Sequence, residues 1–106
     1  MKALITGAGG FCGRHLVDFL MSQGVEVHTI GTRKSEVSSH HQISNIASVG
    51  ELSEIVSKVY PDYIFHLAGM LQSTDPLKCY LVNTQYAAAL LCAIESVGIT
   101  NSPVLL

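Results

Sequence analysis

Three glycines near the amino terminus have the spacing and setting of a phosphate-binding loop. Gly7, Gly10 and Gly13 follow a short apolar run that predicts a strand, and they lead into a segment with helical apolar spacing. In such a loop the first glycine permits a tight turn, the second lets backbone approach a pyrophosphate, and the third lets helix and strand pack closely. A glycine turn without a ligand is the alternative, but the strand before the loop and the helix after it favour a dinucleotide site.

The end of the second predicted strand carries cations where an acid is usual. Dinucleotide-binding domains that take NAD commonly place Asp or Glu there, on the adenosine ribose. This sequence has Thr32, Arg33 and Lys34 after the strand expected at residues 25–30. A guanidinium can form a paired, charge-assisted contact with a 2′-phosphate, so the pattern favours NADP over NAD as the cofactor. The alternative is that Arg33 and Lys34 are solvated loop charges.

Other reactive side chains give weaker signals. His66, near the end of a predicted strand, is interpreted as a packed, hydrogen-bonded histidine and not as a catalyst. Cys12 stands at a helix start, where a thiol can be reactive, but is interpreted as a small packing residue. His40 and His41 have no further ligand at a suitable spacing, so no metal site is predicted.

These candidate residues must be positioned by alternating strands and helices. The pattern predicts strands at residues 2–6, 25–30, 42–46, 63–67 and 103–106, with helices at 11–23, after 48, and from 76 to about 97. A capping box of Ser48 and Glu51 begins the second helix, and Asp75 with Pro76 begins the third. We therefore expect one α/β domain over residues 1–106, a partial Rossmann-type, doubly wound parallel sheet. The expected strand order is 3-2-1-4, with a fifth strand just beginning beside the fourth.

Composition excludes several classes of partner. The net charge is −2 and the cations are scattered, which leaves no basic stripe for nucleic acid. No apolar run approaches the ~18 residues of a membrane span, and no signal peptide precedes the first strand, so we expect a cytoplasmic protein without membrane contact. Residues 87–94 are apolar on every face of the predicted long helix. Such a helix is normally covered all round, which predicts a homo-oligomer.

Three segments together resemble the extended short-chain dehydrogenase/reductases that act on nucleotide sugars, the NAD-dependent epimerase/dehydratase family. They are LITGAGGFCG at residues 4–13, PDYIFHLAG at 61–69 and YLVN at 80–83. Within that group, EVHTIGTR at 26–33 and the second segment look most like GDP-mannose 4,6-dehydratases and GDP-4-keto-6-deoxymannose reductases. The resemblance implies hydride transfer at a sugar carbon, with NADP or NAD as the cofactor.

The resemblance also implies roles at the first matched positions. Phe11 and Cys12 would offer backbone N–H groups to the pyrophosphate. Thr32 and Arg33 would hold the adenosine ribose and its phosphate.

Further matched positions would surround the adenine and the nicotinamide side. Asn45 would accept a hydrogen bond from the adenine amino group where the family commonly has Asp, and the backbone N–H of Ile46 would reach the ring. Leu67, Ala68 and Gly69 would line the cofactor at the end of the fourth strand, although plain strand core is the alternative for the first two. Asn83, on the long helix, would support the active site.

The family's catalytic pair is not found in these 106 residues. In the family, a Tyr-x-x-x-Lys pair after the fifth strand moves a proton during hydride transfer. The residues four positions after Tyr60, Tyr63, Tyr80 and Tyr86 are Ile64, Leu67, Thr84 and Leu90. Three interpretations stay open. The chain is a piece of a nucleotide-sugar enzyme that supplies the cofactor site, with the sugar nucleotide bound by the rest of the domain, or it is a truncated, non-catalytic nucleotide-binding or interaction module. The third is a nucleotide-sensing regulator of the same fold.

Overall fold

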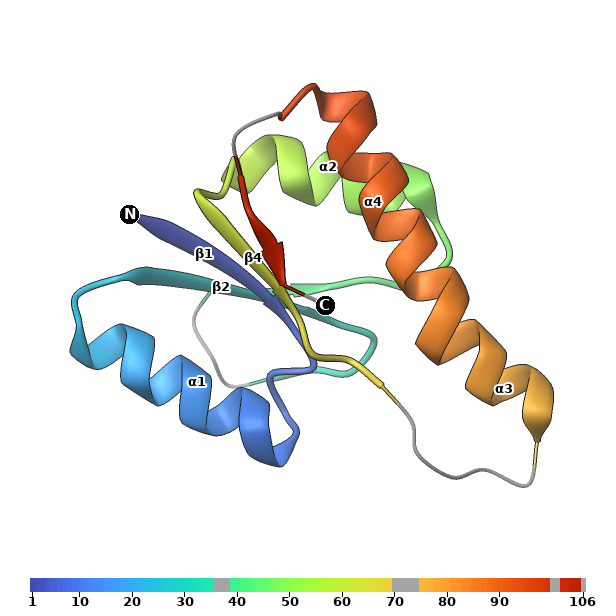
Figure 1. The fold of residues 1–106 in the computed structure, drawn as a ribbon, viewed down its shortest axis with the longest axis horizontal. Coiled ribbons are helices and arrows are strands. Elements are labelled where there is room, and N and C mark those ends of the chain that lie inside the picture. Colours follow the sequence, from blue (N-terminus) through green and yellow to red (C-terminus); the bar gives the residue numbers. More distant parts are fainter. Residues whose placement is uncertain (36–38, 70–74, 100–101, 106) are drawn as a thin grey trace.

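A computed structural model describes residues 1–35, 39–69, 75–99 and 102–105. In these ranges the chain forms a sheet of five parallel strands in the order β3-β2-β1-β4-β5. The strands are β1 (Lys2–Thr6), β2 (Glu26–Gly31), β3 (His40–Gln42), β4 (Tyr63–His66) and β5 (Val104–Leu105). Figure 1 shows β1 in the middle of the sheet, between β2 and β4. The predicted order is therefore confirmed, and with it the Rossmann-type fold.

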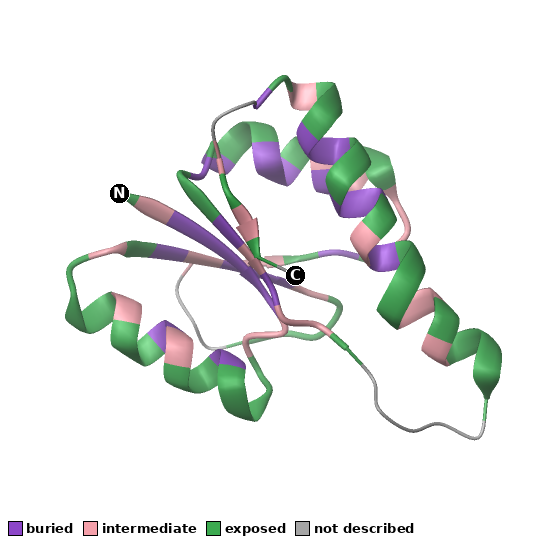
Figure 2. Cartoon of the chain, viewed as in Figure 1, coloured by how far each residue is buried: buried purple, intermediate pink, exposed green. Residues whose placement is uncertain are grey.

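Helices cover both faces of this sheet. Helix α1 (Phe11–Ser22) lies on one face, and helices α2 (Val49–Val59) and α4 (Tyr86–Val97) lie together on the other (Figure 1). Leu4 of β1 belongs to the core beneath α2 and α4, whereas its neighbour Ile5 packs with α1. Figure 2 shows the buried residues gathered in the central strands and on the inner sides of the helices. A strand enclosed in this way needs apolar side chains at consecutive positions, which is the pattern that predicted β1.

The third strand lies earlier in the chain than the 42–46 predicted from sequence. His40 and His41 pair with Thr29 and Ile30 of β2, and the strand ends at Gln42. The apolar residue that suggested a later strand, Ile43, is buried in the main core at 3% exposure. Ile43 is apolar because it packs in the core just after the strand has ended. The strand itself begins with two histidines, which the apolar pattern did not indicate.

The capping box at the start of α2 is half formed. The Ser48 hydroxyl accepts a hydrogen bond from the backbone N–H of Glu51 at 3.2 Å, as predicted. The Glu51 carboxylate does not return to Ser48, however, because it accepts from the backbone N–H of Ser44 at 2.8 Å and from its hydroxyl at 2.6 Å. These bonds hold the pKa of Glu51 below its usual value. The carboxylate thus ties the loop after β3 to the helix that follows it.

The predicted long helix is continuous but contains a π-helical turn. It runs through α3 (Pro76–Tyr80), the π-helical segment η1 (Leu81–Gln85) and α4. The Asp75 carboxylate accepts from the backbone N–H of Leu77 at 3.0 Å, and Gly98 stands past the helix end with a φ of +83°. Both ends are therefore as predicted. The π turn was not predicted, and such turns are frequent at functional sites.

By length and composition alone, the 22-residue stretch Pro76–Val97 is apolar enough to cross a membrane. The buried core helix of a soluble domain passes the same test. Here the carboxyl-terminal part packs closely on α2, as Figure 1 shows.

The outward side of α4 is uncovered within the described chain; it is apolar in its middle and ends in the exposed Glu95 and Ser96. Tyr86, Leu90 and Ile94 face the core and are buried, whereas Leu91 is 43% exposed and its neighbour Cys92 is also exposed. Packing on the sheet and on α2 therefore covers one side of this helix, which leaves an uncovered strip of Ala88, Leu91 and Cys92 facing outward.

Candidate nucleotide-binding site

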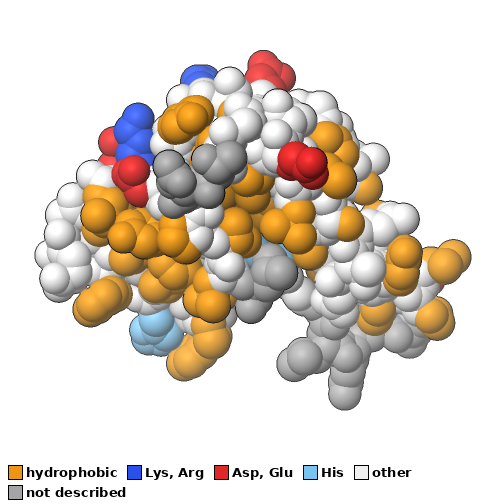
Figure 3. Space-filling view, turned by 45° about the horizontal axis from the view of Figure 1, so that its top comes forward, with side chains coloured by type: hydrophobic (Ala, Val, Ile, Leu, Met, Phe, Trp, Pro, Cys, Tyr) orange, Lys and Arg blue, Asp and Glu red, His pale blue; other side chains and the backbone are white. Residues whose placement is uncertain are grey.

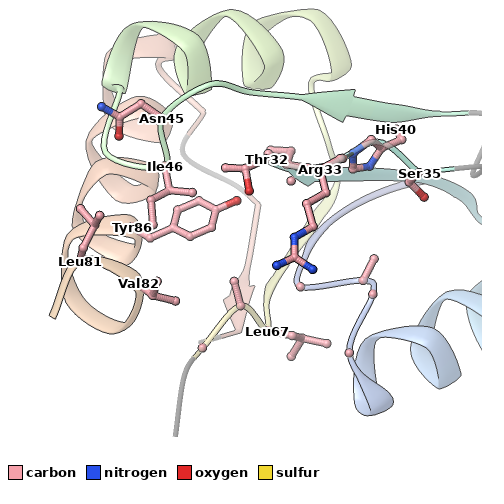
Figure 4. A pocket seen from close by; sticks show the side chains of 18 of the residues that line it. Thr32, Arg33, Ser35, His40, Asn45, Ile46, Leu67, Leu81, Val82 and Tyr86 are labelled. Atoms are coloured by element: carbon pink, nitrogen blue, oxygen red, sulfur yellow. Dashed lines mark hydrogen bonds between the residues drawn. The ribbon is translucent and has the colours of Figure 1, made fainter. Parts of the chain in front are cut away.

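A pocket of about 710 Å³ opens at the carboxyl ends of the strands. Four loops and one helix form its wall: the glycine loop after β1, the segment after β2, the loop after β3, the residues after β4, and the start of the long helix (Figure 4). Open α/β sheets bind their ligands in this crevice, where neighbouring strands send their connections to opposite faces of the sheet. The glycine loop and the cationic segment of the sequence analysis therefore meet in one place.

The outer two glycines of the loop are required by packing. Gly7 has a φ of +73°, and a Cβ there would lie 2.5 Å from the backbone nitrogen of Ala68. A Cβ on Gly13 would overlap the carbonyl oxygen of Gly7 and would lie 2.7 Å from the Cα of Ala8. The loop thus seats against the end of β4 on one side and against helix α1 on the other. This is the tight turn and close helix packing that the spacing predicts.

The middle glycine leaves open space. A Cβ on Gly10 would have one atom within 4 Å, the carbonyl oxygen of Gly7, at an ordinary 3.5 Å. Gly10 also precedes α1 as its N-cap residue and offers no side-chain cap to the first N–H groups of that helix. N–H groups in the first turn of a helix have no partner within the helix. They are thus free to bind an anion here.

Side chains of β3 hold the cationic segment after β2 by its backbone. The His40 Nε2 donates to the carbonyl oxygen of Arg33 at 2.8 Å, and the Gln42 amide donates to that of Thr32 at 3.3 Å. Because Nε2 carries the proton, Nδ1 of neutral His40 accepts from the Thr29 hydroxyl, 2.7 Å away. A buried threonine in β2 and a histidine in β3 therefore fix where Arg33 leaves the sheet.

Positive charge dominates the pocket wall. Arg33, Lys34 and Lys78 all line it, and among its described lining residues there is no Asp or Glu. The Arg33 side chain extends into the pocket in Figure 4. Cations without a carboxylate in a crevice at strand ends form a site suited to an anionic ligand.

The loop after β3 contributes a polar and an apolar residue. Asn45 and Ile46 both line the pocket, on the side opposite Arg33 (Figure 4). The amide oxygen of Asn45 already accepts a hydrogen bond from the backbone N–H of Ala47 at 2.8 Å. A carbonyl-type oxygen has two lone pairs, so one remains for a ligand donor.

A buried polar pair underlies the end of β4. The Thr6 hydroxyl accepts from the backbone N–H of Ala68 at 3.2 Å and lies 2.7 Å from Nδ1 of His66. His66 is 7% exposed, and burial holds the pKa of its imidazole below the ordinary value. The tautomer of the histidine decides whether the hydroxyl donates to Nδ1 or accepts from it. The pair fixes the backbone of Ala68 against the glycine loop.

Nine of the thirteen residues proposed for the cofactor from the sequence line the pocket: Gly7, Gly10, Thr32, Arg33, Asn45, Ile46, Leu67, Ala68 and Gly69. Ala68 also packs against the core cluster beneath α2 and α4, and Leu67 against the one beneath α1. Both residues therefore contribute to the core as well as to the pocket wall.

Four of the proposed residues do not line the pocket: Phe11, Cys12, Gly13 and Asn83. Phe11 and Cys12 have exposed side chains, but the role implied for them uses only their backbone N–H groups. Asn83 lies behind the pocket, with its amide oxygen 3.4 Å from the position of a Cβ on Gly69.

Sequence reasoning missed the wall that the long helix provides. Lys78, Leu81, Val82 and Tyr86 line the pocket from one side of this helix. Their spacing of three or four residues is the signal that could have found them once the helix was placed beside the glycine loop. His40 was considered only as a metal ligand, and no group of metal-binding side chains occurs in the described ranges.

Residues 3–105 match the NAD dependent epimerase/dehydratase family. The chain belongs to this family. It is 38% identical over 99 residues to the UDP-2-acetamido-2,6-beta-L-arabino-hexul-4-ose reductase of Pseudomonas aeruginosa, covering 92% of this chain and 23% of that protein. It is 32% identical over 107 residues to the GDP-6-deoxy-D-talose 4-dehydrogenase of Aggregatibacter actinomycetemcomitans, covering 99% of this chain and 34% of that protein. The chain therefore spans only 23% and 34% of the lengths of these two relatives.

Solved structures share the fold. The UDP-glucose 4-epimerase of Thermotoga maritima, solved with UDP-glucose, superposes with a TM-score of 0.81 and 25% identity over 98% of this chain and 37% of that one. The UDP-glucose 4-epimerase of Thermus thermophilus, solved with NAD, gives a TM-score of 0.79 and 24% identity over 93% of this chain and 35% of that one.

Proposed function

We propose that this epimerase/dehydratase-family chain holds a nicotinamide dinucleotide for an enzyme acting on nucleotide sugars, and that it takes NADP in preference to NAD. The observation that carries the proposal is the pocket itself. A close-packed glycine loop at the start of α1 faces three cations, with no carboxylate among the described lining residues. The bound dinucleotide would accept or return a hydride, and the residues of this chain would bind and orient it.

The substrate class is proposed from the relatives. The reductase, the 4-dehydrogenase and a CDP-paratose 2-epimerase of Salmonella typhi are named for UDP-, GDP- and CDP-linked sugars. The phosphates of a sugar nucleotide are anionic, so a pocket lined by cations suits them. One of these cations is Lys78, near the start of the long helix. In this proposal the protein moves a hydride at a sugar carbon.

Titration of the purified protein with NADPH and NADH at matched salt tests the cofactor proposal. We expect both dinucleotides to bind, NADPH more tightly, as followed by nicotinamide fluorescence. GTP serves as the control, because it is a polyanion without the extended dinucleotide shape. Failure of both dinucleotides to bind, or equally tight binding of GTP, would contradict a dinucleotide site.

We further propose that the protein associates with a second copy through the outer side of α4. Figure 3 shows hydrophobic side chains spread over several parts of one face, with few charged ones between them, so exposed apolar surface is not confined to α4. Leu91, 43% exposed, stands on the uncovered strip of α4. A self-complementary contact between two such strips would bury both.

Sedimentation across a concentration series is expected to show a mass that rises with concentration. Leu91→Glu should shift this curve to the monomer, because a carboxylate on the strip would have to be buried without a partner. Gln23→Glu, at an exposed polar position after α1, is the control for the added charge and should behave as wild type. A wild-type protein that stays monomeric at every concentration would contradict the proposal.

A further inference from the structure

Among the described residues, the Tyr86 hydroxyl has no hydrogen-bond partner. The residue is 3% exposed, and its hydroxyl oxygen is sealed from solvent without a hydrogen-bond partner among the described residues. The buried His66 meets the Tyr86 ring edge-on at 4.9 Å between ring centroids, and its Nε2 likewise has no hydrogen-bond partner among the described residues. Buried polar groups are nearly always hydrogen-bonded. An orphaned hydroxyl therefore calls for an explanation.

Packing alone does not explain this hydroxyl. Phenylalanine has the same ring and would fill the same space without the cost of burying an unpaired O–H group. The other tyrosine on the long helix, Tyr80, is 53% exposed and can bond to water. The hydroxyl of Tyr86 is thus a cost to the folded chain in the structure as it stands.

The position of Tyr86 in the pocket wall indicates a role for its hydroxyl in ligand binding. The residue is part of the pocket wall, and Figure 4 shows its ring extending from the long helix with the oxygen directed inward, between Ile46 and Leu67 and toward Thr32. The same figure shows Ile46 and Asn45 on the neighbouring loop, and Arg33 across the pocket. The ring therefore starts on the side where the loop after β3 meets the helix, and its hydroxyl reaches into the interior of the pocket between that side and Arg33.

We propose that the Tyr86 hydroxyl binds the purine of the dinucleotide, donating a hydrogen bond to a ring nitrogen of the adenine. This inference rests on the proposed function and assigns one further residue to that site. Adenine ring nitrogens are acceptors, and a phenol O–H is a donor. With the 2′-phosphate drawn to Arg33, the base lies toward Ile46 and the helix, which is the side that carries Tyr86.

The chemistry of the phenol suits binding and not proton transfer. Burial raises the pKa of Tyr86 to about 12, so the group keeps its proton at neutral pH and stays a donor. The oxygen is sealed in the ligand-free chain, so this bond requires side chains of the pocket wall to shift when the base binds. This shift costs free energy and offsets part of the gain from the new hydrogen bond. We therefore expect the bond to contribute only modestly to the free energy of binding.

Tyr86→Phe separates binding from structure because the two roles move in opposite directions. The variant removes one buried, unpaired oxygen, so the melting temperature of the ligand-free protein should stay the same or rise. Its dissociation constants for NADPH and for adenosine 2′,5′-bisphosphate should both rise about five- to tenfold. Nicotinamide mononucleotide, which lacks the adenosine half, should bind the variant and the wild type equally. Tyr80→Phe, on the same helix but exposed, is the control and should change none of these values.

The outcomes distinguish this inference from the proposed function. A wild-type protein that binds neither NADPH nor NADH overturns both. A wild-type protein that binds NADPH, with a Tyr86→Phe variant whose dissociation constants stay within twofold, overturns the role of Tyr86 and leaves the cofactor site standing. A variant that loses affinity for nicotinamide mononucleotide and for adenosine 2′,5′-bisphosphate alike overturns the assignment to the adenine end.

Discussion

Gly7→Ala is expected to destabilise the folded chain by about 3 kcal/mol or more, a large part of the total stability of a small domain. Two costs add at this position. The left-handed backbone, with a φ of +73°, strains any residue with a Cβ by about 1–2 kcal/mol. The new Cβ would also lie 2.5 Å from the backbone nitrogen of Ala68, and backbone atoms cannot turn aside as a flexible side chain does. Denaturant unfolding followed by circular dichroism measures the loss.

Gly9→Ala is the matched control for this experiment. It stands two positions along the same loop, its φ is not in the left-handed region, and a Cβ there would have nothing within 4 Å. Its unfolding free energy should stay within about 1 kcal/mol of wild type. Equal stability of the two variants would show that the loop is not seated on the end of β4 as the structure has it.

The parts of the fold that local pattern determines were predictable from sequence. The consecutive apolar residues of β1 identify a strand enclosed by helices on both faces, and regular alternation of strands and helices then restricts the sheet to one common order. The ends of the long helix were also predictable, because Asp75 caps the first turn and Gly98 takes the left-handed position after the last. In each case the signal and the structure lie within a few residues of each other.

Features that depend on tertiary contact were not predictable. β3 consists of His40, His41 and Gln42, which have no strand-like alternation, and they pair because β2 offers them an edge. The Glu51 carboxylate has two possible partners within reach, Ser48 and Ser44, and only the folded loop decides between them. The helical spacing of residues 76–97 gave no sign of a π turn, since every residue in it is compatible with an ordinary helix.

The candidate site divides in the same way. The glycine loop and the cationic segment after β2 follow directly from strand ends, so their spacing along the chain placed them together. Tyr86 enters the pocket from a helix that is distant in sequence, and nothing local distinguishes it from a core tyrosine. Its orphaned hydroxyl becomes visible only when its surroundings are known.

Arg33→Ala is expected to weaken NADPH binding by roughly 10- to 100-fold, with NADH binding almost unchanged. The two cofactors differ only in the 2′-phosphate, so an effect confined to NADPH reports on that group. A hydrogen bond between charged partners contributes about 1.5–3 kcal/mol, which is the basis of the range. The backbone of Arg33 is already fixed by His40, so the guanidinium does not bear the whole cost of ordering its loop.

Matched titrations with both cofactors at low and moderate salt measure the effect, and Lys58→Ala is the control. Lys58 is an exposed cation on α2 that does not line the pocket, so its loss changes the net charge by the same amount without touching the site. If Arg33 acts only through the general field of the protein, the two variants will weaken NADPH binding equally, and salt will erase the difference from wild type. If it contacts the 2′-phosphate, the loss will be confined to Arg33→Ala and will persist in part at higher salt, because a paired contact is screened less than a distant charge. Equal wild-type affinities for NADPH and NADH, unaltered by Arg33→Ala, would mean that the missing acid at the end of β2 does not select the cofactor.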